Sequence, residues 1–225
     1  MITKDWFADF HTHTIFSDGE LLPSELLQRA QQRGCRCLAI TDHVDSSNME
    51  FVLSRLLRFV EELGQQWNTL VVPGVELTHV PPGRIEKLAL RARQMGAKWV
   101  VVHGETLVEP VAASTNKAAL EAGVDLLAHP GLISLEDAAT AAASGVFLEL
   151  STRKGHSLAN GWVVRMAREA GARLLINSDT HGPQDILEPD FRARIGLGAG
   201  MNSQELDLAW SNASELVERF GGEKS

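Results

Sequence analysis

Two histidines near the N-terminus are the first residues whose types and spacing could do chemistry. His11 and His13 lie two residues apart in a segment of strand-forming residues. On a strand their imidazoles would point the same way, about 7 Å apart, close enough to hold one metal ion or a close pair of ions. Asp9, one step earlier on that face, could orient a ligand from behind it. Most isolated pairs of this kind are surface or hydrogen-bonded histidines, so a metal site is indicated only if further candidate ligands follow along the chain.

Further histidines and carboxylates recur where short apolar segments end. They are His43, Glu76, His103, His129, Glu149, Asp179 and His181. Imidazole and carboxylate ligands without thiolates suit Zn, Mn or Fe, and the set is too rich in nitrogen for Ca or Mg. Because the candidates outnumber the ligands that one ion binds, we expect two to three divalent transition-metal ions bridged by a carboxylate. Hydrolysis is the chemistry that such clustered ions favour.

The elements that must position these groups alternate along the whole chain. Strands are predicted at about 6–10, 37–40, 70–75, 99–102, 126–128, 146–148 and 174–176, and helices at 23–33, 51–63, 85–95, 116–122, 135–143, 162–170 and 204–220. Near-continuous apolar strands indicate a parallel sheet covered on both faces. In a closed barrel all the strand ends meet at one mouth, whereas the outer strands of an open sheet would lie too far apart to share a site. We therefore predict an α/β fold, a TIM-like (β/α)7 barrel with the metal site at the C-terminal ends of its strands.

Length and composition narrow the classes of function. A chain of 225 residues suits one core, so residues 1–225 are expected to form a single domain. The net charge of −8 argues against a long nucleic acid as partner but not against a small anion, because bound metal ions can reverse the local sign. Cys35 and Cys37 are read as buried thiols in a reducing cytosol. Without a signal peptide or an apolar run of membrane length, we expect a cytoplasmic protein and no membrane partner.

Six motifs in order, with His103 between them, resemble the PHP (polymerase and histidinol phosphatase) family from about residue 7 to 182. They are Asp9-Phe10-His11-Thr12-His13, Ser17-Asp18-Gly19, Thr41-Asp42-His43, Gly74-Val75-Glu76, Ala128-His129-Pro130-Gly131 and Ser178-Asp179-Thr180-His181. The resemblance implies a distorted seven-stranded barrel with a trinuclear metal site. It also implies that Glu76 bridges two ions and that the other ligands are His11, His13, His43, His103, His129, Asp179 and His181. Near Asp18 some phosphatase members of the family have a histidine, so Asp18 is expected as a ligand here and the metal identity stays open.

The segment after the sixth predicted strand bears on the substrate. Arg153 and Lys154 would lie at the barrel mouth, where they could hold phosphate oxygens or form a solvated loop. Phosphatase-like family members have a similar Arg-Lys-Gly there, which favours phosphate binding. We expect a metal-dependent phosphoesterase of histidinol-phosphatase type, acting on a small phosphomonoester, with Glu76, Asp179 and Arg153 in catalytic roles.

Two other functions stay open at this point, a nuclease or nucleotide phosphodiesterase on the same site and a non-catalytic metal-bearing interaction module. Three residues also keep two interpretations each. His79 and His156 fall in loops, where exposed histidines explain them at least as well as site residues do. Glu149 is either a metal ligand or an acceptor of a hydrogen bond from a ligand. The sequence decides neither the substrate nor the oligomeric state.

Overall fold

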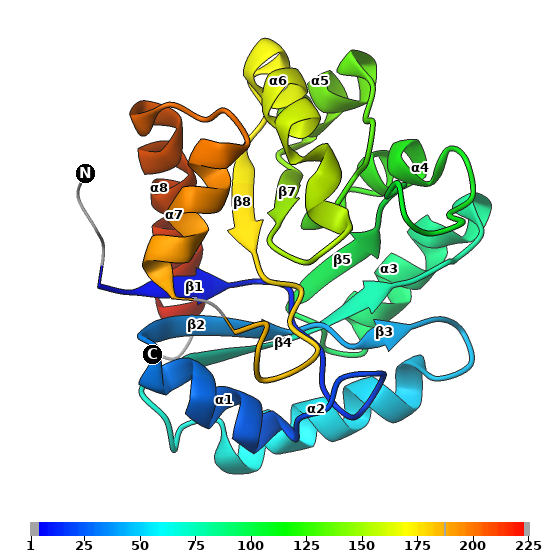
Figure 1. The fold of residues 1–225 in the computed structure, drawn as a ribbon. Helices are drawn as coiled ribbons and strands as arrows, with labels where there is room; N and C mark the ends of the chain where they lie inside the picture. Colours follow the sequence, from blue (N-terminus) through cyan, green and yellow to red (C-terminus); the bar gives the residue numbers. More distant parts are fainter. Residues whose placement is uncertain (1–4, 187, 223–225) are drawn as a thin grey trace.

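The computed structural model describes residues 5–186 and 188–222, and a parallel β-sheet forms its centre (Figure 1). The ends of the predicted domain, 1–4 and 223–225, lie outside the described residues. The sheet follows the order β1-β2-β4-β5-β6-β7-β8. Its strands are β1 (Phe7–Asp9), β2 (Cys35–Ile40), β4 (Leu70–Leu77), β5 (Trp99–His103), β6 (Leu126–Ala128), β7 (Phe147–Ser151) and β8 (Leu174–Asn177).

The sheet closes on itself just beyond the ends of β1 and β8. Thr12 and Thr180 form an isolated parallel bridge. The amide of His13 donates to the carbonyl of Thr180 at 2.8 Å, and the amide of Asp179 donates to the carbonyl of His11 at 3.0 Å. This seam completes a nearly closed barrel, so the predicted TIM-like α/β barrel of seven strands is confirmed. One further strand, β3 (His43–Val44), pairs with β4 and prolongs the line of β2 after a break at 41–42.

Helices follow the strands, and they surround the sheet in Figure 1. They are α1 (Pro23–Gln32), α2 (Met49–Leu63), α3 (Ile85–Gln94), α4 (Thr115–Glu121), α5 (Leu135–Ser144), α6 (Asn160–Ala170), α7 (Pro189–Gly198) and α8 (Ser203–Gly222). The predicted helices are all present with small differences in their bounds. Helix α7 was not predicted, because its buried residues are Arg192 and Gly196, which give no apolar periodicity.

The barrel interior is filled by side chains from every strand of the closed sheet. Trp99 lies at its centre, with its ring centroid 5.4 Å from that of Phe10, and its indole N–H donates to the carbonyl of Phe10 at 3.0 Å. Phe220 of α8 packs against Trp99, the first residue of β5, and so covers the amino ends of the strands. Because this end is filled, the polar residues gather at the opposite mouth. Cys35 and Cys37 are both buried, as expected.

Among the described residues, no helix has both the length and the apolar character needed to cross a membrane.

Candidate metal centre

The chain's eight histidines form one continuous group at the carboxyl ends of the strands, where β/α barrels carry their active sites. Neighbouring imidazole rings have centroids between 4.1 Å and 6.2 Å apart, and these contacts link all eight. Carboxylates lie among the rings. The structure thus brings together all nine predicted ligands, namely His11, His13, Asp18, His43, Glu76, His103, His129, Asp179 and His181.

The predicted alternation that places Asp9 on the face of the two histidines does not continue, because β1 ends at Asp9. The Asp9 carboxylate accepts from the backbone amide and hydroxyl of Ser178 and pairs with the buried guanidinium of Arg192. It also accepts from the backbone amide of His11 at 3.4 Å. Asp9 therefore supports the backbone that carries His11 rather than an imidazole ring.

Glu76 and Asp179 lie at the centre of the group. Oε1 of Glu76 is 3.3 Å from Nε2 of His11, and its Oε2 is 2.6 Å from Nδ1 of His43. Burial opposes a charge on His43, but Glu76 outweighs it and raises the pKa of His43 to about 9. Burial also raises the pKa of Asp179 to about 7, although His11 acts in the opposite direction. Asp179 has a φ of 55°, a left-handed conformation that costs energy in a residue with a side chain.

Several buried polar atoms of the group have no hydrogen-bond partner in the described structure. They are Nε2 of His11, both ring nitrogens of His13, Oε1 of Glu76, Nδ1 of His103, Nδ1 of His129 and Oδ1 of Asp179. A buried polar atom without a partner costs about 1–3 kcal/mol, so a cluster of them calls for an occupant.

The spacing of the donor atoms fits a metal ion. Oδ1 of Asp179 lies 3.2 Å from Nε2 of His13. Two ligand atoms that are each ~2.0–2.2 Å from one tetrahedral ion lie roughly 3.3–3.6 Å apart. Several nitrogen–oxygen pairs in the group, at 3.1–3.5 Å, lie within or close to this range. The residues therefore fit divalent ions with nitrogen and oxygen ligands.

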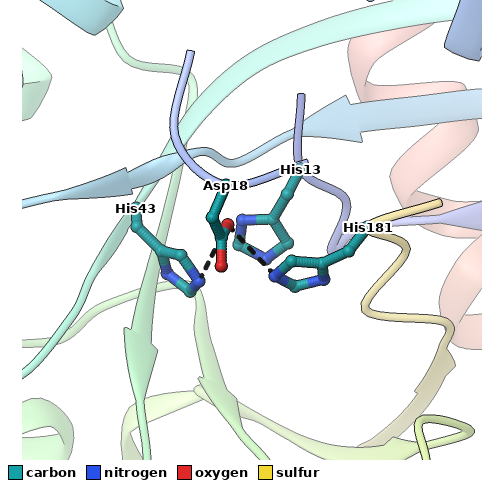
Figure 2. A group of neighbouring side chains, drawn as sticks. All are labelled: His13, Asp18, His43 and His181. Carbon is teal, nitrogen blue, oxygen red and sulfur yellow. Dashed lines mark ion pairs between the residues drawn. The ribbon is translucent and has the colours of Figure 1, made fainter. Parts of the chain in front are cut away.

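One side of the group, here called the Asp18 flank, consists of His13, Asp18, His43 and His181 (Figure 2). Oδ1 of Asp18 lies 3.5 Å from Nε2 of His43 and 3.2 Å from Nε2 of His181. The ring of His13 lies between the other two, with centroid distances of 4.2 Å to each. Although burial opposes it, the contact with His181 lowers the pKa of Asp18.

The loop that presents Asp18 is anchored by Asp42. This buried carboxylate accepts from the amide and hydroxyl of Thr14 and from the hydroxyl of Ser17, at 2.7–2.8 Å. A Cβ on Gly19 would lie 2.7 Å from the backbone of His13, so glycine is required where the loop folds back. The Ser17-Asp18-Gly19 motif thus positions a carboxylate that is itself exposed.

The other side, here called the His156 flank, consists of His103, Glu109, His129 and His156. The interpretation of His156 as an exposed loop residue is wrong, since only 6% of it is exposed and its ring stacks on that of His129 at 4.1 Å. Burial lowers the pKa of His156 to about 4. Glu109 was not predicted. It lies in a loop without a motif, and the only available signal was that this loop follows a strand ending in His103.

His79 remains at the edge of the His156 flank. Its side chain is exposed, its φ is 51°, and its ring centroid lies 5.1 Å from that of His103. Nε2 of His79 is 3.4 Å from Oε2 of Glu109. The expectation of an exposed loop histidine therefore agrees with the structure.

Glu149 acts as an acceptor behind the ligands. Its Oε1 lies 2.9 Å from Nδ1 of His11 and accepts a hydrogen bond from the side-chain amide of Asn177. Its Oε2 accepts a hydrogen bond from the backbone amide of His129. Burial lowers the pKa of His11, but Glu149 and Glu76 outweigh it and raise that pKa well above its ordinary value. Glu149 thereby fixes His11 with Nε2 turned toward the centre, as outer contacts do in metal sites.

Arg153 contacts the cluster, whereas Lys154 is exposed. Nη1 of Arg153 donates to the carbonyl of Asp179 at 3.3 Å and lies 3.7 Å from Oδ2 of Asp185. Its side chain is about one-third exposed, with a surface free to meet a ligand, whereas Lys154 is exposed to solvent. Of the two basic residues, Arg153 is therefore the one beside the cluster.

Comparison with known proteins gives matches of two kinds. The family model of the PHP domain matches residues 9–103. An uncharacterized protein of Methanocaldococcus jannaschii is 48% identical over 215 residues, covering 94% of this chain and 99% of that protein. A protein of Shewanella sp. strain MR-4, named a probable phosphatase, is 31% identical over 202 residues, covering 77% of this chain and 76% of that protein.

Solved structures share the fold at low identity. A chain in the cryo-EM structure of archaeal ribonuclease P with mature tRNA superposes with a TM-score of 0.70 at 15% identity, covering 95% of this chain and 91% of that chain. A two-domain protein of Bacteroides vulgatus, described as containing a predicted PHP-like metal-dependent phosphoesterase, gives 0.50 at 16% identity, covering 79% and 52%. The matches to the family model and to the Shewanella relative agree with the motifs and the barrel, and the chain belongs to the PHP domain family.

Proposed function

We propose that this protein is a metal-dependent hydrolase of phosphate esters, acting as a phosphomonoesterase on a small substrate, with residues 1–225 forming one domain. The observation that carries the proposal is the cluster of buried donor atoms without partners, which lies beside one partly exposed arginine. The naming of the Shewanella relatives as probable phosphatases supports the same class of reaction.

In this proposal the nine predicted residues hold two to three ions. Glu76 would contribute to holding two of them, because its two carboxylate oxygens face different histidines. His11, His13 and Asp179 serve the central position, His103 and His129 a second, and Asp18, His43 and His181 a third. The bound ions would supply Lewis acidity, which polarises a phosphoryl group and activates water as a nucleophile.

The chain's own residues then have defined tasks. Glu149 holds Nδ1 of His11, so that the Nε2 atom keeps its direction. Asp179, held in a left-handed conformation between β8 and the seam, keeps its oxygens directed at His13 and His11. Arg153 offers guanidinium donors at the rim, which would form a charge-assisted hydrogen bond to a phosphate oxygen.

A phosphomonoester suits this arrangement better than a diester. A monoester is close to a dianion at neutral pH and has three non-bridging oxygens, so one is left for Arg153 when ions bind the others. The net charge of −8 also makes a long nucleic acid an unfavourable substrate.

The test is the variant Arg153→Ala. Losing one charge-assisted partner of a partly desolvated phosphoryl group costs about 2–4 kcal/mol, so monoester turnover should fall roughly 30- to 1000-fold. Metal content should stay at the parent value, and inorganic phosphate should inhibit the variant less than the parent.

Lys154→Ala is the matched control, because it removes the neighbouring positive charge from an exposed position and should change turnover little. Monoester hydrolysis at the parent rate in Arg153→Ala would remove the arginine from the reaction. A parent protein that cleaves diesters but no monoesters would contradict the proposed function.

A further inference from the structure

Two loops at the mouth carry polar groups that the proposed reaction does not use. The loop 104–114 after β5 carries Thr106 and Glu109, and the loop 152–155 after β7 leads into His156. Oγ1 of Thr106 lies 2.7 Å from Nδ1 of His156, and Oε1 of Glu109 lies 3.4 Å from its Nε2. The His156 ring is therefore held on one side and faces a carboxylate on the other.

Packing joins these loops. Gly155 has a φ of +94°, and a Cβ at this position would lie 3.3 Å from a methyl carbon of Val108. Glycine is therefore needed both for the backbone conformation and for the approach of Val108. The meeting of Glu109 and His156 is thus fixed by tertiary packing rather than by two freely moving side chains.

The remaining partners come from the strand ends. His103, His129 and His156 each offer a ring nitrogen within 4.8 Å of the others, and all three are buried. Oε2 of Glu109 lies 3.1 Å from Nε2 of His103. Nδ1 of His103 and Nδ1 of His129 are buried without a hydrogen-bond partner in the described structure. The two Glu109 contacts, 3.1 Å to Nε2 of His103 and 3.4 Å to Nε2 of His156, are close to the separation of two ligands of one ion.

We propose that Glu109 and His156 are ligands of the divalent ion held by His103 and His129, an inference that rests on the metal site proposed above. Three imidazoles with a carboxylate select Zn²⁺, Co²⁺ or Fe²⁺ over Mg²⁺ or Ca²⁺. Because its three histidines are all buried, whereas only His13 is buried among the four residues of the Asp18 flank, we expect this position to bind its ion more tightly than the Asp18 flank does. The protein should therefore show at least two classes of metal affinity.

The experiment is a Co²⁺ titration of the chelator-treated full chain, followed by visible absorption, with Zn²⁺ calorimetry in parallel. The variants are Glu109→Gln, which keeps the shape of the side chain, and His156→Asn, which keeps an amide near Thr106 but removes Nε2. Each should weaken the tight class by at least the ~10- to 100-fold that follows loss of even an outer contact of a metal ligand. Glu136→Gln, the same substitution at an exposed position of α5, is the matched control and should bind like the parent.

If both variants bound metal with the affinity and stoichiometry of the parent, the assignment would be overturned. If only one variant lost metal affinity, the assignment would be overturned for the other residue. Circular dichroism checks that each variant folds. If either does not, Thr106→Val serves instead, because it releases Nδ1 of His156 without removing a ligand. It should weaken the tight class by a smaller factor, and an unchanged affinity would count against His156. Absence of phosphatase activity in a parent that binds metal normally would contradict the proposed function and leave this inference standing.

Discussion

The Asp18 flank and the His156 flank use the same side-chain chemistry, but they are built differently. The carboxylate of the Asp18 flank belongs to a side chain that is 57% exposed, and hydrogen bonds to the buried Asp42 hold its loop in place. In the His156 flank the three histidines are buried, and Glu109 is brought in by a second loop. The side chain of Glu109 is 37% exposed, so the His156 flank is the more covered of the two rather than a closed site.

This difference separates the two requirements of a hydrolytic metal site. An open position can exchange water and substrate, whereas a covered one retains its ion. We therefore expect the Asp18 flank to face the substrate and the His156 flank to hold metal when the concentration of free metal is low.

The largest effect should come from Glu76, which lies between the flanks, with Oε2 2.6 Å from Nδ1 of His43 and Oε1 3.8 Å from Nε2 of His129. Glu76→Gln removes a bridging charge, and several kcal/mol of stabilisation corresponds to about a 10³-fold loss of turnover. Metal analysis should show that both affinity classes are weakened. If only one affinity class were weakened, Glu76 would serve the metal position of one flank and not of both.

A smaller and one-sided effect is expected for Asp18→Asn. The amide keeps the shape but loses the charge, so the weak class of metal sites should lose about 10- to 100-fold in affinity, while the tight class stays at the parent value. Calorimetry on the chelator-treated protein measures both. A weakened tight class would mean that the two flanks are not independent.

The smallest effect is expected for His79→Ala. His79 is exposed and touches only the edge of the His156 flank, through His103 and Glu109. The unfolding free energy should change by no more than about 0.5 kcal/mol, as is usual for surface substitutions. Thermal unfolding and metal titration would check this. An affinity loss as large as that of His156→Asn would make His79 a ligand and extend the covered flank.

Residues at strand ends were predictable from the apolar strand pattern and Asp18 from the family resemblance, whereas Glu109 and the burial of His156 followed from neither. The alternation of apolar strands and helices predicts the barrel, and its geometry then brings His43 and Glu76 to one mouth. His156 follows a turn that depends on the left-handed Gly155, and Glu109 follows no pattern at all, so only tertiary packing reveals them. Sequence periodicity carries no information on which loops meet.

Helix α7 escaped prediction for a related reason. Its buried anchor is a charged residue, Arg192, whose partner Asp9 lies far away in sequence on β1. The guanidinium of Arg192 also donates a hydrogen bond to the backbone carbonyl of Ile176 at 2.7 Å. A helix whose fully buried residues are an arginine and a glycine shows little hydrophobic periodicity, although Ala193 and Leu197 also pack against the core.

The seam between β1 and β8 has a mechanical consequence. The isolated bridge between Thr12 and Thr180 closes the barrel, and the candidate ligands flank it on both sides, His11 and His13 in the segment after β1 and Asp179 and His181 in the segment after β8. An ion bound between these ligands would link the two segments that this isolated bridge pairs. At a free metal concentration 100 times Kd, one such ion adds about 2.7 kcal/mol to the stability of the fold. Chelation would then do more than stop catalysis, because amide hydrogens along the seam would exchange faster as the barrel opens there.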